Sequence, residues 1–410
     1  MAKFGLSVNE IGIYESLLLV AGFISFSWIA GLIQTLLPLH NNNSTFKTQG
    51  KKSPVIFNAT ILLFVFSILS AIVLYIFKNQ ISGLIAKNTD FQYFNLFILY
   101  MLVASPTHII EYIYLLNNKA KSIVFYGVLN FSLQVILVAI PLLLGMNFVF
   151  VLWAMIAWMA FRFVWLIALL FKYSEFKIST SFIKEHLILA FPLILSTLLS
   201  GSAQYIDGVI VTGFFDESKF AIFRYGAREF PLVILMATAF SNGMIPEFSK
   251  SSKEEVLATI RKKSTQLVHL LFPISIAMLL ISNWIYPIIY NEQFAESAKV
   301  FNIYLLLIIS RLVFPQTILI GLKKTKTILY AAVFEIIINV LSSLILVYYF
   351  GIIGVAYATV IAYFFEKIFL AISVQKIGIS IKSYIPLKLY TVYTIAIICV
   401  YILIDFVIYR

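Results

Sequence analysis

The distribution of lysine and arginine along the chain is the feature that most constrains its fold. Long apolar runs divide the 410 residues, and six of the segments between them hold 19 of the 30 lysines and arginines. These basic segments are 39–53, 116–122, 172–186, 249–266, 323–327 and 375–388. They alternate with segments that carry little positive charge. Because positive charge marks the cytoplasmic side of membrane proteins, the alternation predicts a polytopic membrane protein with its basic loops inside.

Composition excludes a water-soluble domain. Hydrophobic residues make up 61% of the chain and charged residues only 12%, whereas soluble domains carry about 25% charged residues. Since a spanning helix takes roughly 20 apolar residues, we expect an all-α polytopic protein with about 12 transmembrane helices. The predicted spans are 11–37, 54–77, 93–115, 123–145, 148–171, 187–213, 223–246, 267–290, 299–322, 328–349, 353–374 and 387–408.

Charge and cysteine usage narrow the setting further. The net charge of +12 follows mostly from topology, so it does not indicate a nucleic-acid partner. The single cysteine, Cys399, rules out an intrachain disulfide and argues against a cysteine-ligated metal site. We expect a multi-pass protein of the bacterial cytoplasmic membrane. The parity of the spans places the N-terminus of the chain outside.

The two halves of the chain echo each other at an offset of 205 residues. KAKSIVFYGVLN at 119–130 resembles KTKTILYAAVFE at 324–335, and each begins in a short basic loop. Two spans and a nearly uncharged turn follow in both halves, and the same offset aligns Arg162 with Lys367. We therefore expect two pseudo-repeated lobes around a central cavity, which is a common arrangement in transporters.

The spans group into four regions. They are an N-terminal lobe with five of six helices at 1–172, a cytoplasmic inter-lobe linker at 173–186, a six-helix C-terminal lobe at 187–374 and an extra helix at 375–410. The first lobe thus lacks a leading helix that the second has.

Three segments resemble the polysaccharide and oligosaccharide-lipid flippases of the multidrug/oligosaccharidyl-lipid/polysaccharide (MOP) exporter superfamily. LSVNEIGIYESLLLV at 6–20 is similar to the segment that joins the family's first and second helices. FPLILSTLLSGSAQYIDGVIVTGFFDESKFAIFRYGA at 191–227 resembles the seventh helix and the turn into the eighth. YYFGIIGVAYATVIAYFFEK at 348–367 resembles the joint between the eleventh and twelfth helices.

The resemblance implies a flippase that moves an undecaprenyl-pyrophosphate-linked oligosaccharide across the membrane by alternating access, for O-antigen-like or capsule-like polysaccharide. It implies transport rather than an enzymatic reaction, with no bound cofactor and with a proton or sodium gradient as the candidate energy source. The implied partners are the lipid-linked glycan and the bilayer. A polysaccharide polymerase and glycosyltransferases are candidate protein partners.

Ionisable residues within membrane spans are costly and are usually functional. The basic candidates for binding the pyrophosphate are Arg162, Arg311, Arg224, Arg228 and Lys367. Arg162 and Arg311 lie near the middle of their spans, so we expect them to face the cavity. Arg224 and Arg228 are four residues apart and would share one helical face. That face would line the cavity or contact lipid headgroups.

Acidic residues within spans supply the candidates for ion coupling or gating. They are Asp207, Glu335, Glu366 and Glu111. Asp207 is placed to pair with Arg224 or Arg228, as a structural pair or as a gate. Glu335 could take up a proton or oppose Lys367. A purely structural pairing is the alternative for each of these carboxylates.

Two other functions stay open. One is a cation-coupled drug or metabolite antiporter of the same superfamily, and the other, less supported, is an O-antigen polymerase-type membrane enzyme. Cavity charge separates the first alternative from the flippase, because an arginine-lined cavity favours an anionic glycan carrier and an acidic one favours cationic drugs. A polymerase would carry a long polar outer loop, whereas the longest outer loop here is about 78–92. No GK[ST] phosphate loop or HExxH metal motif is present.

Overall fold

Helices make up nearly all of the protein in a computed structural model, which describes residues 2–42, 52–85, 93–249, 251–322 and 324–408. The one strand-like contact in these ranges is an isolated bridge between Ser53 and Ser174. Nine described helices are long and apolar enough to cross a membrane, or ten if one bent pair counts as a span. The all-α membrane fold is therefore confirmed, whereas the expected count of about 12 is not.

Contacts between Cα atoms divide the chain into two compact units. Unit 1 comprises Met1–Tyr205 and Phe215–Ser218, and unit 2 comprises Ile206–Phe214 and Lys219–Arg410. The segment expected to link two lobes, 173–186, lies inside unit 1.

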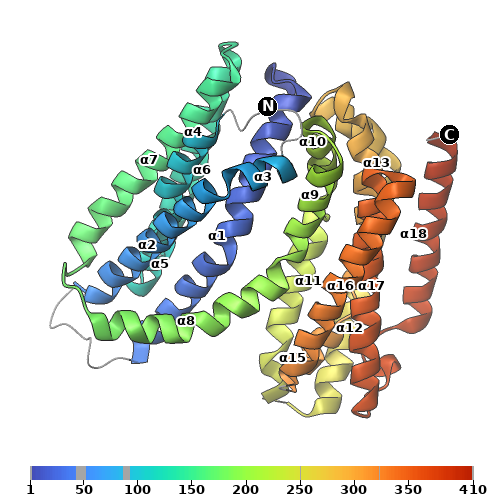
Figure 1. The fold of residues 1–410 in the computed structure, drawn as a ribbon. Coiled ribbons are helices and arrows are strands. Elements are labelled where there is room, and N and C mark those ends of the chain that lie inside the picture. Colours follow the sequence, from blue (N-terminus) through green and yellow to red (C-terminus); the bar gives the residue numbers. More distant parts are fainter. Residues whose placement is uncertain (1, 43–51, 86–92, 250, 323, 409–410) are drawn as a thin grey trace. The chain divides into compact units, whose positions relative to one another are not determined.

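Unit 1 contains the first eight α-helices of the chain (Figure 1). Its elements are η1 (Ala2–Phe4), α1 (Val8–Asn42), α2 (Pro54–Ile76), α3 (Lys78–Ile85), α4 (Phe94–Ala104), η3 (Ser105–Ile109), α5 (Ile110–Leu116), α6 (Ala120–Leu143), α7 (Phe148–Tyr173) and α8 (Thr180–Gly201). A core of aliphatic and aromatic side chains joins α1, α2, α5, α7 and α8.

Glycines on α1 allow α8 to pack closely against it. A methyl group at Gly31 would lie 2.4 Å from Cγ1 of Ile194 on α8, and one at Gly22 would lie 2.7 Å from the ring of Tyr205, which follows α8 in the first turn of α9. Small residues that let backbones approach are the usual means of helix packing in membranes, where lipid is as apolar as the side chains. The close packing explains why α8 belongs to unit 1.

Unit 2 contains the remaining helices (Figure 1). They are α9 (Ala203–Phe214), α10 (Glu217–Gly226), α11 (Pro231–Met244), η4 (Pro246–Ser249), α12 (Lys253–Ile289), η5 (Glu292–Phe294), α13 (Ala295–Leu305), α14 (Ile308–Arg311), α15 (Pro315–Gly321), α16 (Thr325–Phe350), α17 (Ile352–Lys376), η6 (Ile381–Ser383) and α18 (Leu387–Ile408). The first residues of α9 and α10 are counted with unit 1.

Both units contain the helical hairpin that the sequence repeat predicts. The helix α6 packs against α7 in unit 1, and α16 packs against α17 in unit 2. Each hairpin turns at a glycine with positive φ, 65° at Gly145 and 61° at Gly351. In the second hairpin the helices approach so closely that a methyl group at Gly354 would lie 2.1 Å from the Leu346 carbonyl oxygen.

Four spans that we predicted as continuous helices are interrupted. The predicted span 187–213 divides into α8 and α9, and the predicted span 223–246 divides into α10 and α11. The span 93–115 contains η3, and the span 299–322 divides into α13, α14 and α15. Three of the four interruptions have a proline at or beside the break, and proline removes a helical N–H donor and clashes with the preceding turn.

Apolar side chains cover the outer faces of the hairpin helices. Val124, Phe125 and Val128 on α6 are more than 60% exposed, as is Tyr348 on α16. Exposure of this kind is suited to lipid rather than to water. Together with the long apolar helices, it identifies a multi-pass membrane protein.

Candidate functional site

A polar cavity of about 220 Å³ lies within unit 2, lined by residues of α11, of the segment from α14 to α15, and of α17. Its lining combines two cations with hydroxyl, amide and apolar side chains. The lining residues are Ala237, Thr238, Ser241, Asn242, Ile245, Arg311, Val313, Phe314, Gln316, Thr317, Ile320 and Lys367. The hydroxyls of Ser241 and Thr317 lie 2.6 Å apart and share a hydrogen bond across α11 and α15.

Arg311 is held on one side by a carboxylate and on another by an aromatic ring. Its Nε and Nη2 atoms donate to the two carboxylate oxygens of Glu229 at 2.7 and 2.5 Å. Its guanidinium carbon lies 4.4 Å from the ring centroid of Tyr363 on α17. A planar guanidinium is suited to both contacts at once, which a lysine ammonium would not be. The pairing fixes the arginine at the edge of the cavity.

The Arg311–Glu229 pair joins two interruptions in the helices. Glu229 lies in the segment 227–230 between α10 and α11, and Arg311 is the last residue of α14. The axes on either side of the second interruption, Glu292–Arg311 and Pro315–Gly321, are bent by 44°. Broken helices in transporters commonly bring charged groups and free backbone groups to the binding site.

Lys367 reaches the same cavity from α17. Its Nζ lies 2.9 Å from Oε2 of Glu366 and 3.5 Å from Oε1 of Gln316. Adjacent residues point about 100° apart on a helix, so only the lysine lines the cavity while its long side chain still reaches Glu366. Glu335 on α16 lies within electrostatic range of both Lys367 and Arg311.

Asp207 on α9 occupies a second polar site within unit 2, and three neutral groups donate to it. The hydroxyls of Thr359 and Tyr304 donate to its Oδ2 atom at 2.5 and 3.0 Å, and Nδ2 of Asn339 donates to its Oδ1 atom at 3.1 Å. The carboxylate is 5% exposed. Oδ1 of Asn339 and Oγ of Ser343, both buried, have no hydrogen-bond partner in the described structure.

The expected pairing of Asp207 with Arg224 or Arg228 is wrong. The structure ends α10 at Gly226, where Ala227 N donates to the Phe223 carbonyl and Arg228 N donates to that of Gly226. Arg224 and Arg228 therefore do not share a helical face. Arg228 is exposed, with its guanidinium 5.7 Å from the ring of Tyr225.

Arg162 belongs to unit 1 and is buried among aromatic side chains. Its Nε donates to the Tyr126 hydroxyl at 3.0 Å, and its Nη2 lies 3.5 Å from the Thr107 carbonyl oxygen. Its guanidinium carbon lies 5.7 Å from the Trp158 ring. The residue that aligns with it in the repeat is Lys367, which contacts Gln316 beside the break between α14 and α15. Neutral groups hold Arg162, whereas the carboxylate of Glu366 holds Lys367.

Glu111 lies in α5 of unit 1 and acts on Tyr126 electrostatically. The structure thus places the candidate residues Arg311, Lys367, Glu366 and Glu335 around one cavity of unit 2, Asp207 in a second polar site of that unit, and Arg162 and Glu111 in unit 1.

Sequence reasoning missed the partners that define these two sites. Glu229 was not paired with Arg311 from the sequence, because 82 residues separate the two. The sequence search considered only ionisable residues within spans, so it did not include the neutral residues Asn339, Thr359 and Tyr304. The spacing of Asn339 and Thr359 across the predicted turn at 350–354 could have indicated that they meet.

Comparisons with known proteins define the family. The sequence profile described as "Polysaccharide biosynthesis protein" matches residues 1–299. The chain belongs to this family. No curated protein matches the sequence closely enough to count as a relative.

Solved structures of the MOP superfamily share the fold. The lipid II flippase MurJ in an inward closed conformation is 17% identical, with 97% of this chain and 90% of that chain covered and a TM-score of 0.68. An inward-facing multidrug resistance MATE family transporter is 16% identical, with 88% of each chain covered and a TM-score of 0.62. A MOP superfamily transporter from Pyrococcus furiosus, described as having a binding pocket of reverse polarity, is 15% identical over 90% and 88%, with a TM-score of 0.55. The fold expected from the sequence resemblance is therefore confirmed.

Removing the charge of Glu229 should weaken the fold of unit 2. In the E229Q variant Arg311 keeps a partner of similar shape but loses the opposite charge. The side chains of Arg311 and Glu229 are only 26% and 17% exposed, so water does not replace the lost interaction fully. We expect a loss of about 1–3 kcal/mol in unfolding free energy, measured as thermal unfolding in detergent. The exchanged pair E229R/R311E should recover part of the loss. Wild-type stability of E229Q would show that the pair does not hold the two helix breaks.

Proposed function

We propose that this protein is a flippase for undecaprenyl-pyrophosphate-linked oligosaccharide units in surface polysaccharide assembly. The family match to polysaccharide biosynthesis proteins and the fold shared with a lipid II flippase support the substrate class. The observation that carries the proposal is the charge of the unit 2 cavity, whose lining includes Arg311 and Lys367 and no carboxylate. Guanidinium and ammonium groups are the usual ligands of phosphate oxygens.

An antiporter of cationic drugs is the second candidate, because MATE transporters share the fold. The acidic groups Glu229, Glu366 and Glu335 near the cavity favour it. They do not line the cavity, however, and two of them are engaged with its cations. The charged side chains that line the cavity are therefore cations, which favours an anionic substrate. An assay of drug resistance in cells that express the protein separates the two functions.

Substitution of the cavity cations should stop glycan export. We expect R311A and K367A each to lower the export of lipid-linked glycan at least ten-fold, because each removes a charged hydrogen bond to phosphate that is worth about 1.5–3 kcal/mol. Export is measured as surface polysaccharide in a strain that depends on this gene. The control is K376A, which removes an exposed lysine from the last turn of the same helix, α17. Normal export by both cavity variants at normal expression contradicts the proposal.

We propose that coupling to an ion gradient uses the Asp207 site. A buried carboxylate whose hydrogen-bond donors are neutral can bind a proton, or can hold a sodium ion together with other oxygen atoms. The oxygens that fit such an ion are those of Asp207, Oγ1 of Thr359 and the unpartnered Oδ1 of Asn339. The bound ion would neutralise the carboxylate of Asp207. Binding and release of the ion would then favour different conformations of the transporter, which couples the ion gradient to transport.

Replacing Asp207 by asparagine should abolish the ion response. Binding of an ion to the folded state alone stabilises it by about 2.7 kcal/mol at 100 times the dissociation constant. We expect sodium or a fall in pH to raise the unfolding temperature of the wild-type protein and not that of D207N. The control E254Q, which removes an exposed carboxylate from the first turn of α12, should keep the response. An identical response in wild type and D207N contradicts the assignment.

We propose a cytoplasmic-membrane location with the basic loops inside and the N-terminus of this chain outside. Single cysteines in a C399S background test the orientation. Cysteine at Ala2 should react with an impermeant reagent added to intact cells, and cysteine at Lys262 should react only after the membrane is opened. The reverse pattern contradicts the predicted topology. A polysaccharide polymerase and glycosyltransferases are the protein partners to test by cross-linking.

A further inference from the structure

One end of unit 1 carries a group of lysines whose positions are fixed by backbone hydrogen bonds. The helices α2, α6 and α8 begin at this end, and α7 terminates there. Ser53 N donates to the Tyr173 carbonyl at 2.9 Å, and Glu175 N donates to the Ser53 carbonyl at 3.3 Å. Asn58 extends this clamp, because its Nδ2 atom donates to the Lys177 carbonyl at 2.8 Å. The segment after α7 is therefore bound to the start of α2.

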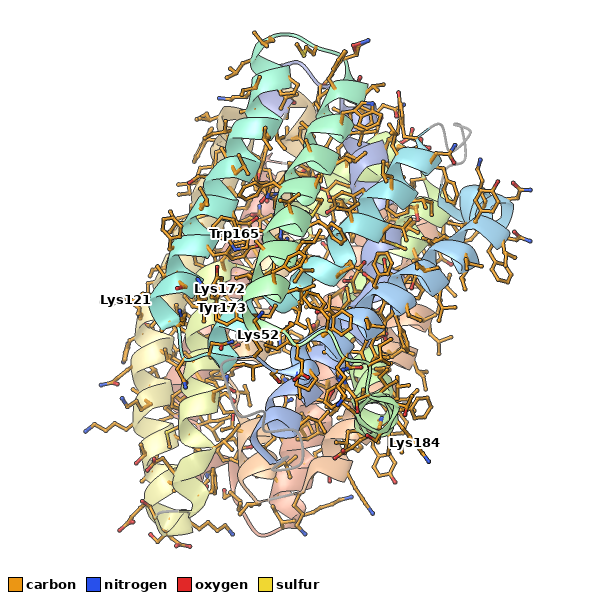
Figure 2. All side chains as sticks on the ribbon, turned by 90° about the vertical axis from the view of Figure 1, so that its left-hand side faces the viewer. Lys52, Lys121, Trp165, Lys172, Tyr173 and Lys184 are labelled. Carbon is orange, nitrogen blue, oxygen red and sulfur yellow. The ribbon has the colours of Figure 1, made fainter. Side chains whose placement is uncertain are left out.

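Two of the lysines converge on one tyrosine ring. The Nζ atoms of Lys119 and Lys172 each lie 5.5 Å from the ring centroid of Tyr173. In the described structure neither lysine forms an ion pair with a carboxylate. Figure 2 shows Lys52 beside Lys172 and Tyr173, where the backbone contact of Ser53 places it, with Lys121 on the outer side of α6. We call these four lysines and Tyr173 the lysine–tyrosine surface.

An anion would relieve the repulsion within this surface. Two ammonium groups on the same ring repel each other, and the ring's negative face offsets only part of that cost. The carboxylates in the neighbouring segment are Glu175 and Glu185, and in the described structure neither forms an ion pair with Lys119 or Lys172. The helix dipoles offset one another here, because α2 and α6 begin at this end and α7 terminates there, so the lysines decide the sign of the charge. The balance of charge at this end is therefore positive.

Apolar side chains border the charged surface. Phe171 and Phe176 are 64% and 52% exposed, and their ring centroids lie 5.2 Å apart. Ile178, which follows Lys177, is 65% exposed. Exposed aromatic rings beside lysines are typical of the membrane interface, where rings meet acyl chains and ammonium groups meet headgroups.

We propose that the lysine–tyrosine surface binds the headgroup of an anionic phospholipid, with Phe171 and Phe176 against its acyl chains. The proposal concerns a lipid that stays with the protein and is separate from the transported substrate and from the unit 2 cavity. The phosphate would lie between Lys119 and Lys172, and Lys52 and Lys121 would add charge around it. The two phenylalanines favour a lipid over a soluble anion, because a free phosphate gains nothing from exposed rings.

Native mass spectrometry of the full chain in detergent tests the proposal. We expect phosphatidylglycerol to remain bound to the wild-type protein more strongly than phosphatidylcholine. Each lysine near an anionic headgroup contributes about 1 kcal/mol, so K119Q/K172Q should retain phosphatidylglycerol at least ten-fold less well. K119R/K172R, which keeps both charges, should retain it. The matched control K262Q/K263Q removes two lysines from α12 and should bind as the wild type does.

Three outcomes overturn the proposal. One is equal retention of phosphatidylglycerol by K119Q/K172Q and the wild type. Another is an equal loss in K262Q/K263Q, which would mean that net charge alone decides binding. The third is stabilisation of the protein by inorganic phosphate to the same degree as by phosphatidylglycerol, with both effects lost in K119Q/K172Q, which would assign the surface to a free anion. If K119Q/K172Q fails to fold, F171A/F176A, which keeps every lysine, replaces it. We then expect F171A/F176A to retain less phosphatidylglycerol than the wild type, and equal retention would overturn the proposal.

Discussion

The ion pair between Arg311 and Glu229 is the interaction on which the cavity of unit 2 depends. Both residues lie where a span is interrupted, so backbone polar groups that a continuous helix would satisfy are left without helical partners. A bidentate contact between a guanidinium and a carboxylate holds these two interruptions together and leaves the arginine beside open space. The ring of Tyr363 completes the enclosure from α17. The cavity thus owes its charge and its shape to the same contact.

Two polar sites in unit 2 illustrate different ways to keep charge inside apolar helices. Around the cavity, opposite charges offset each other, as in the pairs of Arg311 with Glu229 and of Lys367 with Glu366. Around Asp207, neutral hydroxyl and amide groups surround one carboxylate. The first arrangement leaves cationic donors available to a ligand. The second leaves the charge of the carboxylate to be met by a proton or a cation, which is why we assign the two sites different roles.

Hydropathy and charge patterning predicted the membrane fold, because it depends on averages over 20 or more residues. The hairpin repeat was predicted from the similarity of 119–130 to 324–335, and the family from the resemblance of three segments to known flippases. They did not predict the helix breaks, although Pro231 and Pro315 lie at two of them, since proline in a membrane helix is also compatible with a simple kink. The candidate cations Arg311 and Lys367 were found as charges within spans. Their carboxylate partners and the neighbours of Asp207 depend on tertiary contacts between residues far apart in sequence, which periodicity does not encode. The prediction that Arg224 and Arg228 share a helical face was wrong, because α10 ends between them at Gly226.

The two hairpin turns differ in how much room they leave. At Gly145 nothing lies within 4 Å of an added Cβ, whereas at Gly354 the backbone of α16 would be struck at once. The same supersecondary unit therefore exists in an open and a closed version within one chain. A larger side chain or an inserted residue therefore meets less resistance from neighbouring atoms at the 145–148 turn than at the start of α17, where the backbone of α16 lies in contact.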